Sequence, residues 1–317
     1  MFEDDKKYAL VTVICEKFFP GTVVMLHSFL KHNPWFEGEI VILHDSLPEN
    51  YQRFFTVFPG VRFVQISEVL KNRINQLCTG VPHLDLETKK QRFFSLEVLR
   101  LSGYEKLLFC DSDLLFLDCI KELFDMSENP NEPIVRAAGD LYFHTKQFVS
   151  TVTFLPEKQQ NNSHVRLIEK TFNSGFMLFD GELLTQNNYL KSLELLSVAR
   201  WQKIQAPRTD QIVFNLCFSE SFRLLSTRYN YLILHEKAIL NVEKIEPEQI
   251  KVLHFNGKPK PWNHFEVLER IAREMKLVRY CTMWNNAFAE ILPDFHFKLK
   301  IKNGFDPRPV PDDRAKV

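Results

Sequence analysis

The chain has 317 residues, of which 45% are hydrophobic and 25% are charged, with 40 basic side chains against 40 acidic ones. A chain of this length can bury a large core without disulfides or metals to hold it together. The balanced charge argues against a nucleic acid as the main partner, because phosphate backbones favour a basic excess.

The cysteines and the first residues indicate the compartment. None of the six cysteines forms a CxxC pair, which favours a reducing compartment over a disulfide or zinc framework. Residues 1–7 are charged and lack the apolar core of a signal peptide. No apolar stretch approaches the ~20 residues of a membrane span. We therefore expect a cytoplasmic protein, with peripheral membrane contact as an open alternative.

The first half of the chain alternates strand-like and helix-like segments. The predicted strands are 8–14, 39–44, 61–66 and 106–110. The predicted helices are 21–32, 49–58 and 87–101. This order predicts an α/β fold with a mainly parallel sheet and right-handed crossovers.

The second half is less regular. Its predicted strands are 133–138, 176–179 and 250–255. Its predicted helices are 189–201, 210–217 and a segment from 264 to about 289. Residues 295–302 alternate apolar and basic side chains, so this C-terminal tail could touch an anionic membrane surface. An edge strand or a solvated tail explains the same pattern.

Two aspartates follow the fourth predicted strand. The apolar run that ends at Cys110 leads directly into Asp111, Ser112 and Asp113. If the backbone stays extended, the two carboxylates point the same way and repel each other, and a divalent cation such as Mg²⁺ or Mn²⁺ removes that penalty. The carboxyl ends of strands are also where α/β sheets bind ligands. Asp-x-Asp alone is a weak pattern, because most copies are solvated turn residues.

Two short polar segments suit a sugar ligand. Residues 173–175 read Asn-Ser-Gly before a predicted strand, where amide and small side chains can hydrogen-bond a polyol, although an ordinary turn has the same composition. Thr209, Asp210 and Gln211 open a predicted helix. There Thr209 equally suits an N-cap, and Asp210 a partner of the helix dipole.

A third segment, residues 254–262, follows the last predicted strand and reads His-Phe-Asn-Gly-Lys-Pro-Lys-Pro-Trp. Its histidine is a possible metal ligand, its glycine permits a tight loop, and its two lysines can face phosphate. A single histidine after a strand is usually structural, but this combination is rarer.

Together and in this order, the four segments resemble the retaining glycosyltransferases of family 8 over roughly residues 8–265. The resemblance implies a GT-A fold, which has a single Rossmann-like, mainly parallel central sheet flanked by helices, here with a helical C-terminal extension. It implies a catalytic domain at 1–265 that binds a nucleotide sugar, followed by a C-terminal helix and tail at 266–317.

The implied reaction is transfer of a hexose from UDP-glucose or UDP-galactose to a hydroxyl of a glycan, a lipid-linked sugar or a protein, with Mn²⁺ or Mg²⁺. The implied metal ligands are Asp111, Asp113 and His254. The implied donor-binding residues are Val11, Thr12, Phe19, Arg92, Asp111, Ser112, Asn173, Gly257 and Lys260. The implied catalytic residues are Gln211, Asp210 and Lys260.

Within that resemblance, Lys260 would neutralise the leaving diphosphate, Phe19 would stack on uracil, and Gln211 would lie beneath the anomeric carbon. An amide is a poor nucleophile, so same-face attack is favoured over a covalent intermediate. Asp210 is the nearby carboxylate and suits sugar hydroxyls better.

Two other functions compete with this interpretation. A non-catalytic sugar-nucleotide-binding protein on the same fold would carry the same motifs. A nucleotidyltransferase would usually carry a Gly-rich phosphate loop near the N-terminus. The stretch from Ile14 to Gly21 offers only one glycine, which argues against that second alternative.

Overall fold

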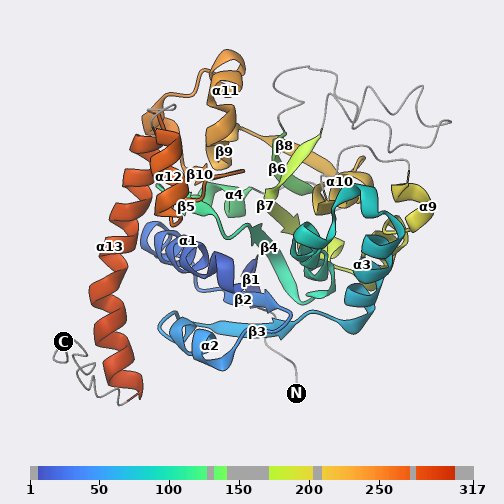
Figure 1. Ribbon diagram of the computed structural model, residues 1–317, viewed down its shortest axis with the longest axis horizontal. Helices are drawn as coiled ribbons and strands as arrows, with labels where there is room; N and C mark the ends of the chain where they lie inside the picture. The colour runs from blue at the N-terminus through green and yellow to red at the C-terminus, as the bar shows by residue number, and fades with distance from the viewer. Residues whose placement is uncertain (1–5, 127–131, 141–170, 203–208, 272–275, 304–317) are drawn as a thin grey trace, which may run out of the picture.

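A computed structural model provides the structure of the chain (Figure 1). It describes residues 6–126, 132–140, 171–202, 209–271 and 276–303. The first residues of the charged N-terminus and the end of the predicted tail lie outside these ranges.

A seven-stranded sheet with the order β3-β2-β1-β4-β7-β6-β8 forms the centre of the molecule. The strands are β1 (Lys6–Val13), β2 (Glu39–His44), β3 (Val61–Gln65), β4 (Tyr104–Cys110), β6 (Val135–Gly139), β7 (Phe172–Asp180) and β8 (Phe222–Leu225). Strand β7 runs antiparallel to both of its neighbours, and all other pairings are parallel. The predicted mainly parallel α/β sheet is confirmed, with β7 as the reversed strand.

A second, smaller sheet was not predicted. It has the order β5-β10-β9 and consists of β5 (Leu114–Phe116), β10 (Val252–His254) and β9 (Tyr231–Leu232). Strand β10 is antiparallel to β5, with His254 opposite Leu114, and parallel to β9. This sheet therefore places His254 directly beside the chain that leaves the Asp pair.

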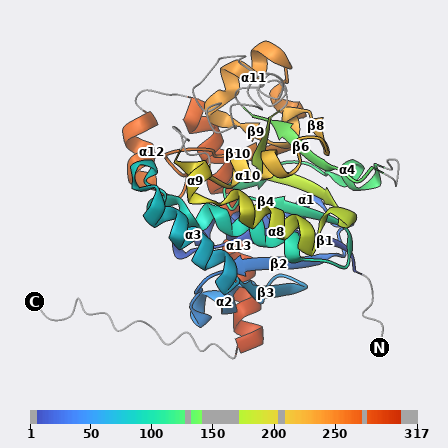
Figure 2. The same cartoon turned by 90° about the vertical axis from the view of Figure 1, so that its right-hand side faces the viewer.

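Helices cover both faces of the central sheet (Figures 1 and 2). The helices are α1 (Phe19–His32), α2 (Glu49–Phe55), α3 (Glu68–Gly80), α4 (Lys121–Asp125), α8 (Gln186–Leu195), α9 (Val198–Trp201), α10 (Thr209–Cys217), α11 (Glu236–Val242), α12 (His264–Ile271) and α13 (Lys276–Asn303). The 3₁₀ helices are η1 (Glu16–Phe18), η2 (Pro82–Leu84), η3 (Glu87–Arg100), η5 (Gly181–Leu183), η6 (Thr227–Tyr229), η7 (Ile233–His235) and η8 (Pro247–Gln249).

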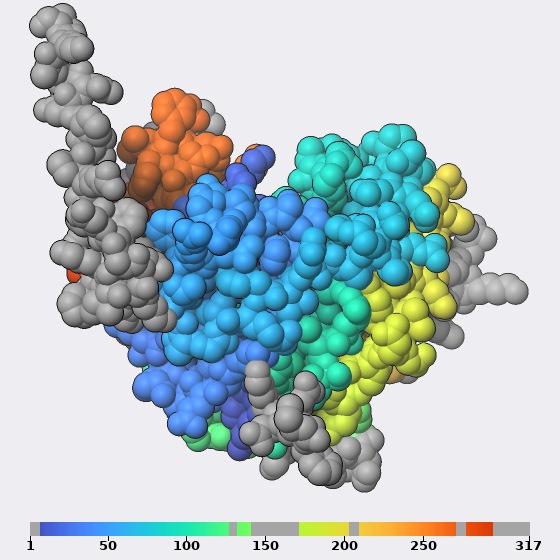
Figure 3. Space-filling view, turned by 90° about the horizontal axis from the view of Figure 1, so that it is seen from below, coloured from blue at the N-terminus to red at the C-terminus, as the bar shows by residue number. Residues whose placement is uncertain are grey.

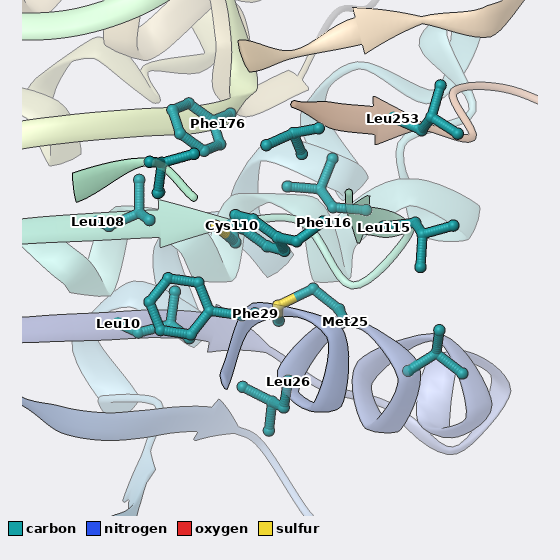
Figure 4. Close-up of a cluster of buried hydrophobic side chains, with 14 of the residues drawn as sticks. Leu10, Met25, Leu26, Phe29, Leu108, Cys110, Leu115, Phe116, Phe176 and Leu253 are labelled. Atoms are coloured by element: carbon teal, nitrogen blue, oxygen red, sulfur yellow. The ribbon is translucent and has the colours of Figure 1, made fainter. Parts of the chain in front are cut away.

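The alternation of side chains along β1 and β4 creates two hydrophobic cores. Val11 and Phe109 face a core that is completed by α3, η3, α8 and α10. Leu10 and Leu108 face the opposite core, which α1, α13 and the small sheet complete (Figure 4). Since successive strand residues point to opposite faces, a strand covered on both sides is apolar throughout. This is why the strands of the first half were visible in the sequence.

Several predicted elements differ in detail. Residues 87–100 form a 3₁₀ helix, the predicted helix 189–201 is divided into α8 and α9, and α3 was not predicted. From below, the α2–β3 segment lies beside α3, which borders the yellow α8–α9 segment (Figure 3). The helix predicted at 210–217 is confirmed as α10.

The edge-strand interpretation of 295–302 is wrong, because this segment lies within α13. Its period-2 pattern does not decide its conformation, since a helix that is already nucleated extends at little cost. Contact of this segment with an anionic membrane stays a prediction.

Helix α13 packs along α1 and contributes to the core of the central sheet. Its buried side chains Tyr280 and Trp284 belong to the same core as Leu10 of β1. The Trp284 ring lies 5.7 Å from the ring of Trp262, which follows the predicted site loop, and Lys31 of α1 pairs with Glu290 at 2.7 Å. Side chains on both sides of residue 265 therefore pack in the same core, and the predicted division into two regions stays a prediction.

We expect Trp284→Ala to lower the free energy of unfolding by about 3–5 kcal/mol, the cost of a large buried aromatic. Trp284 is 2% exposed, whereas Leu292 on the same helix is 54% exposed. The control Leu292→Ala should change stability by less than about 0.5 kcal/mol. Urea unfolding of the full chain measures both. Equal, small effects would mean that α13 is an independent appendage.

Candidate active site

The Asp pair lies in a turn at the carboxyl end of β4. The backbone N–H of Asp111 donates to the carbonyl of Gly175 at 2.8 Å, which continues the pairing with β7. The chain then turns through Ser112 and Asp113 instead of staying extended. The carbonyl of Asp113 accepts from the N–H of Phe255 at 3.0 Å. Main-chain contacts from two distant strands thus hold both sides of the turn.

Ser112 anchors this turn to β1 and α1. Its hydroxyl donates to the carbonyl of Val13 at 2.7 Å and accepts from the Thr22 hydroxyl at 2.9 Å, with Thr12 Oγ1 3.3 Å away. A Cβ on Gly21 would lie 2.4 Å from the Ser112 carbonyl oxygen. The single glycine near the N-terminus therefore serves close packing of α1, which argues further against a phosphate loop.

Asp111, Asp113 and His254, the three predicted metal ligands, lie close together. One ligand atom from each lies within 4.8 Å of the others. His254 Nε2 is 3.3 Å from Asp113 Oδ1 and 3.8 Å from Asp111 Oδ2. Carboxylate oxygens are ligands that Mg²⁺ and Mn²⁺ prefer, and the imidazole favours a transition-metal ion such as Mn²⁺. The residues present fit a divalent cation.

The two carboxylates have different electrostatic surroundings. Burial and the charge of Asp113 raise the pKa of Asp111. Burial would also raise the pKa of Asp113, but the Lys260 ammonium, which contacts Oδ2, and His254 outweigh it and hold this pKa well below its usual range. Like charges at one site push the two pKa values apart in this way, and a bound cation would lower both.

Lys260 and Gly257 lie on the loop that follows β10. Lys260 Nζ donates to the carbonyl of Phe255 at 2.8 Å and lies 5.5 Å from the centroid of the Phe18 ring. Gly257 has a φ of 78°, a left-handed conformation that favours glycine. The loop returns to the N-terminal region where Trp262 Nε1 donates to the carbonyl of Lys17 at 3.1 Å. These contacts aim Lys260 at Asp113.

Gly175 allows β7 to approach Asp111 and His254 closely. A Cβ at this position would lie 2.4 Å from His254 Cε1 and 2.8 Å from Asp111 Oδ2. The glycine of the Asn-Ser-Gly segment is therefore required by the close approach of β7 to these two side chains. The sequence predicted close approach to a polyol here, and the structure shows close approach to the candidate metal ligands.

A chain of side-chain hydrogen bonds connects His254 with Gln211. His254 Nδ1 lies 2.8 Å from Asn230 Oδ1, and Asn230 donates to Asn173 Oδ1 at 2.9 Å. Asn173 donates to Gln211 Oε1, and Gln211 donates to Asp140 Oδ2, each at 3.0 Å. Gln211 and Asn173, both predicted to surround the donor sugar, therefore belong to the same network as His254.

Asn230 and Asp140 belong to this network but were not predicted from the sequence. Asp140 directly follows β6, so the reasoning that singled out a carboxylate after a strand applied to it as well. Asn230 precedes β9, which has only two residues and no recognisable apolar run. No local signal marks Asn230.

Asp210 is held by hydroxyl groups at the start of α10. Its Oδ2 accepts from Ser95 at 3.2 Å and from Ser174 at 3.0 Å, and its Oδ1 accepts from Thr209 at 2.8 Å. Burial raises the pKa of Asp210. Thr209 is the first residue of α10 with a left-handed φ of 40°, and its hydroxyl is directed to Asp210.

The remaining predicted donor-binding residues lie in different surroundings. Arg92 is exposed on η3, close enough for its charge to act on Asp111 and Asp210. The Val11 side chain is fully buried in the core. The Phe19 ring packs edge to face on three aromatic rings of α2, at 5.0 to 5.5 Å between centroids. Contact of Val11 and Phe19 with the uridine of the donor stays a prediction.

Within the described residues, no helix combines the length and the hydropathy needed to cross a bilayer.

Comparison with known proteins finds distant relatives. Galactinol synthase 2 of Solanum lycopersicum is 23% identical over 188 residues, covering 57% of this chain and 52% of that protein. Galactinol synthase 4 of Arabidopsis thaliana is 24% identical over 232 residues, covering 71% of this chain and 64% of that protein. The chain thus spans about half to two thirds of the length of these relatives.

Solved structures share the fold. The galactosyltransferase LgtC, in complex with donor and acceptor sugar analogs, matches with a TM-score of 0.65 at 15% identity, covering 89% of this chain and 95% of LgtC. Mouse xyloside xylosyltransferase 1 matches with a TM-score of 0.53 at 18% identity, covering 80% and 99%. The predicted GT-A fold is confirmed.

The family assignment follows from the sequence itself. The sequence model of glycosyl transferase family 8 matches residues 9–266, which include the Asp pair, the Asn-Ser-Gly strand, α10 and the His254 loop. The two solved structures that share the fold are a galactosyltransferase and a xylosyltransferase. The chain therefore belongs to glycosyl transferase family 8.

Proposed function

We propose that this chain is a metal-dependent hexosyltransferase that moves glucose or galactose from a UDP-sugar to an acceptor hydroxyl on a glycan, a lipid-linked sugar or a protein. The observation that carries the proposal is the convergence of Asp111, Asp113 and His254, with Lys260 in contact with Asp113. The names of relatives, galactinol synthase and galactosyltransferase, support a hexose as the transferred group.

The three candidate ligand side chains support Mn²⁺ or Mg²⁺ as the cofactor. Asp111, Asp113 and His254 would hold the ion, and diphosphate oxygens would complete its coordination. When bound, the ion supplies positive charge against the two phosphates of the donor. The chain's own contribution is to keep Asp113 ionised, which the charge of Lys260 favours.

Lys260 stabilises the leaving group in the proposed reaction. The bond between the sugar C1 and the diphosphate oxygen breaks, and the diphosphate gains negative charge as the sugar becomes oxocarbenium-like. The Lys260 ammonium is already oriented by Asp113 and the Phe255 carbonyl. It therefore stabilises the charge on the diphosphate without having to reorient during the reaction. The charge of Arg92 also acts on Asp111 and Asp210.

The surroundings of Gln211 and Asp210 favour same-face attack. Gln211 is hydrogen-bonded by Asn173 and Asp140, and an amide is a poor nucleophile. Three hydroxyl groups occupy the Asp210 oxygens. We therefore expect the acceptor oxygen to form its bond to C1 on the face that the diphosphate leaves, while a diphosphate oxygen takes the acceptor proton. The product keeps the anomeric configuration of the donor.

We expect Asp113→Ala to abolish Mn²⁺-dependent hydrolysis of UDP-glucose and UDP-galactose, because it removes one of three candidate ligands. UDP release with and without EDTA measures the effect. Asp118→Ala is the matched control, since Asp118 is a more exposed aspartate on the same segment. Near-normal activity of Asp113→Ala in EDTA would contradict the site.

Mn²⁺-dependent binding of UDP-sugar without turnover in the unchanged protein would indicate a non-catalytic binding protein.

We expect Lys260→Ala to lower the turnover number by roughly ten- to a thousandfold, the usual cost of losing one group that stabilises developing charge. Steady-state kinetics with saturating donor gives the turnover number. Lys258→Ala removes an equal charge from the same loop but at an exposed position, so it should have little effect. Comparable losses in both variants would point to a general effect of loop charge.

We expect no covalent sugar on Asp210 during turnover. Intact-mass measurement after rapid acid quenching with the donor detects such a species, and peptide mapping locates it. A hexose on Asp210 would overturn same-face attack but leave the transferase assignment intact.

A further inference from the structure

We infer that Asn230 is a positioning residue for the candidate metal site, because it holds His254 in the one tautomer that can bind a cation. The consequence for catalysis rests on the proposed function, but the tautomer itself does not. Asn230 lies between η6 and β9 and is 0% exposed. It contacts His254 on one side and Asn173 on the other.

The direction of each hydrogen bond follows from one backbone group. The N–H of Gly175 donates to Asn173 Oδ1 at 3.0 Å. A backbone N–H can only donate, so Asn173 must present its oxygen here. That same oxygen faces Asn230 at 2.9 Å and can only accept, so Asn230 must present its NH₂ group to Asn173. The carbonyl oxygen of Asn230 is then left facing His254.

This arrangement determines which nitrogen of His254 carries the proton. Asn230 Oδ1 lies 2.8 Å from Nδ1 and is an acceptor, so Nδ1 carries the hydrogen. In a neutral imidazole the lone pair is then on Nε2, which faces Asp113 and Asp111 at 3.3 and 3.8 Å. The opposite tautomer would direct an N–H at a bound cation and place a lone pair against the Asn230 oxygen.

The other end of Asn173 connects this geometry to the sugar side of the site. Because Asn173 uses its oxygen for Gly175 and Asn230, its NH₂ group is left to donate to Gln211 Oε1. Gln211 in turn presents its own NH₂ group to Asp140. Asn230 therefore orients His254 directly. The hydrogen-bond network on its other side orients Gln211, the residue expected beneath the anomeric carbon.

The first test measures the tautomer in the unaltered protein. Long-range ¹H–¹⁵N correlation spectra distinguish the protonated from the bare ring nitrogen of a neutral imidazole, and show directly whether the ring is neutral. The His254 signal is assigned by its loss in His254→Gln. We expect the proton on Nδ1 and a bare Nε2 in the metal-free full chain. A proton on Nε2 would overturn the inference, and this test needs no altered Asn230.

The second test measures binding of Mn²⁺ alone to the full chain, without donor, by titration calorimetry. We expect Asn230→Leu to weaken binding ten- to a hundredfold, the usual effect of removing a hydrogen-bond partner of a metal-ligating histidine. Asn230→Asp loses the donor to Asn173 but keeps an acceptor for Nδ1–H. It should therefore retain the tautomer and bind Mn²⁺ at least ten times more tightly than Asn230→Leu.

Asn33 supplies the matched control. It is also 0% exposed and lies away from the site. Its side-chain NH₂ donates to the carbonyl of Phe29 at the end of α1, and its side-chain oxygen accepts from the N–H of Ile120. Asn33→Leu should lower thermal stability but leave Mn²⁺ affinity unchanged. If Asn230→Leu behaves like this control, with lower stability and unaltered affinity, Asn230 is merely structural and the inference is wrong.

The outcomes separate this inference from the proposed function. If the unaltered chain binds no Mn²⁺, the metal-dependent function fails, while the tautomer spectra still decide whether Asn230 positions His254. If Mn²⁺ binds tightly and His254 carries its proton on Nε2, the function stands and the inference fails.

Discussion

The arrangement of this site depends on the meeting of two aspartates with an imidazole and an ammonium group that come from a distant part of the chain. Asp113 is buried, and a buried carboxylate is costly unless positive charge or hydrogen bonds compensate it. The pairing of β10 with β5 brings His254 and then Lys260 to Asp113. Without this small sheet, the turn after β4 would hold two mutually repelling charges with little to offset them.

The hydrophobic core holds the same elements in place. Side chains of β1 and β4 are buried on both faces, so neither strand can shift along the sheet without exposing apolar surface. Ser112 is bonded to β1 and α1, and Gly21 allows α1 to approach it closely. The candidate site is therefore formed on elements that the two cores and these hydrogen bonds fix in place.

Much of the first half of the fold was predictable because its signals are local. A continuous apolar run marks β4, and the Asp pair follows it immediately, so strand and site appear together in the sequence. Elements of two or three residues, such as β5 and β9, carry too few side chains to show a period. Asn230 was invisible for the same reason, since an asparagine before a two-residue strand resembles any turn residue.

The sequence by itself determined the α/β class, the Asp pair at a strand end and, through four motifs in order, the family resemblance. Each of these is carried by neighbouring residues or by their order along the chain. Only the tertiary structure decided that the Asp turn pairs with β10 and that β7 runs antiparallel. It also decided that Asn230 faces Nδ1 of His254. These contacts join residues far apart in sequence, and their geometry follows from strand pairing and packing across the whole core, which no local pattern records.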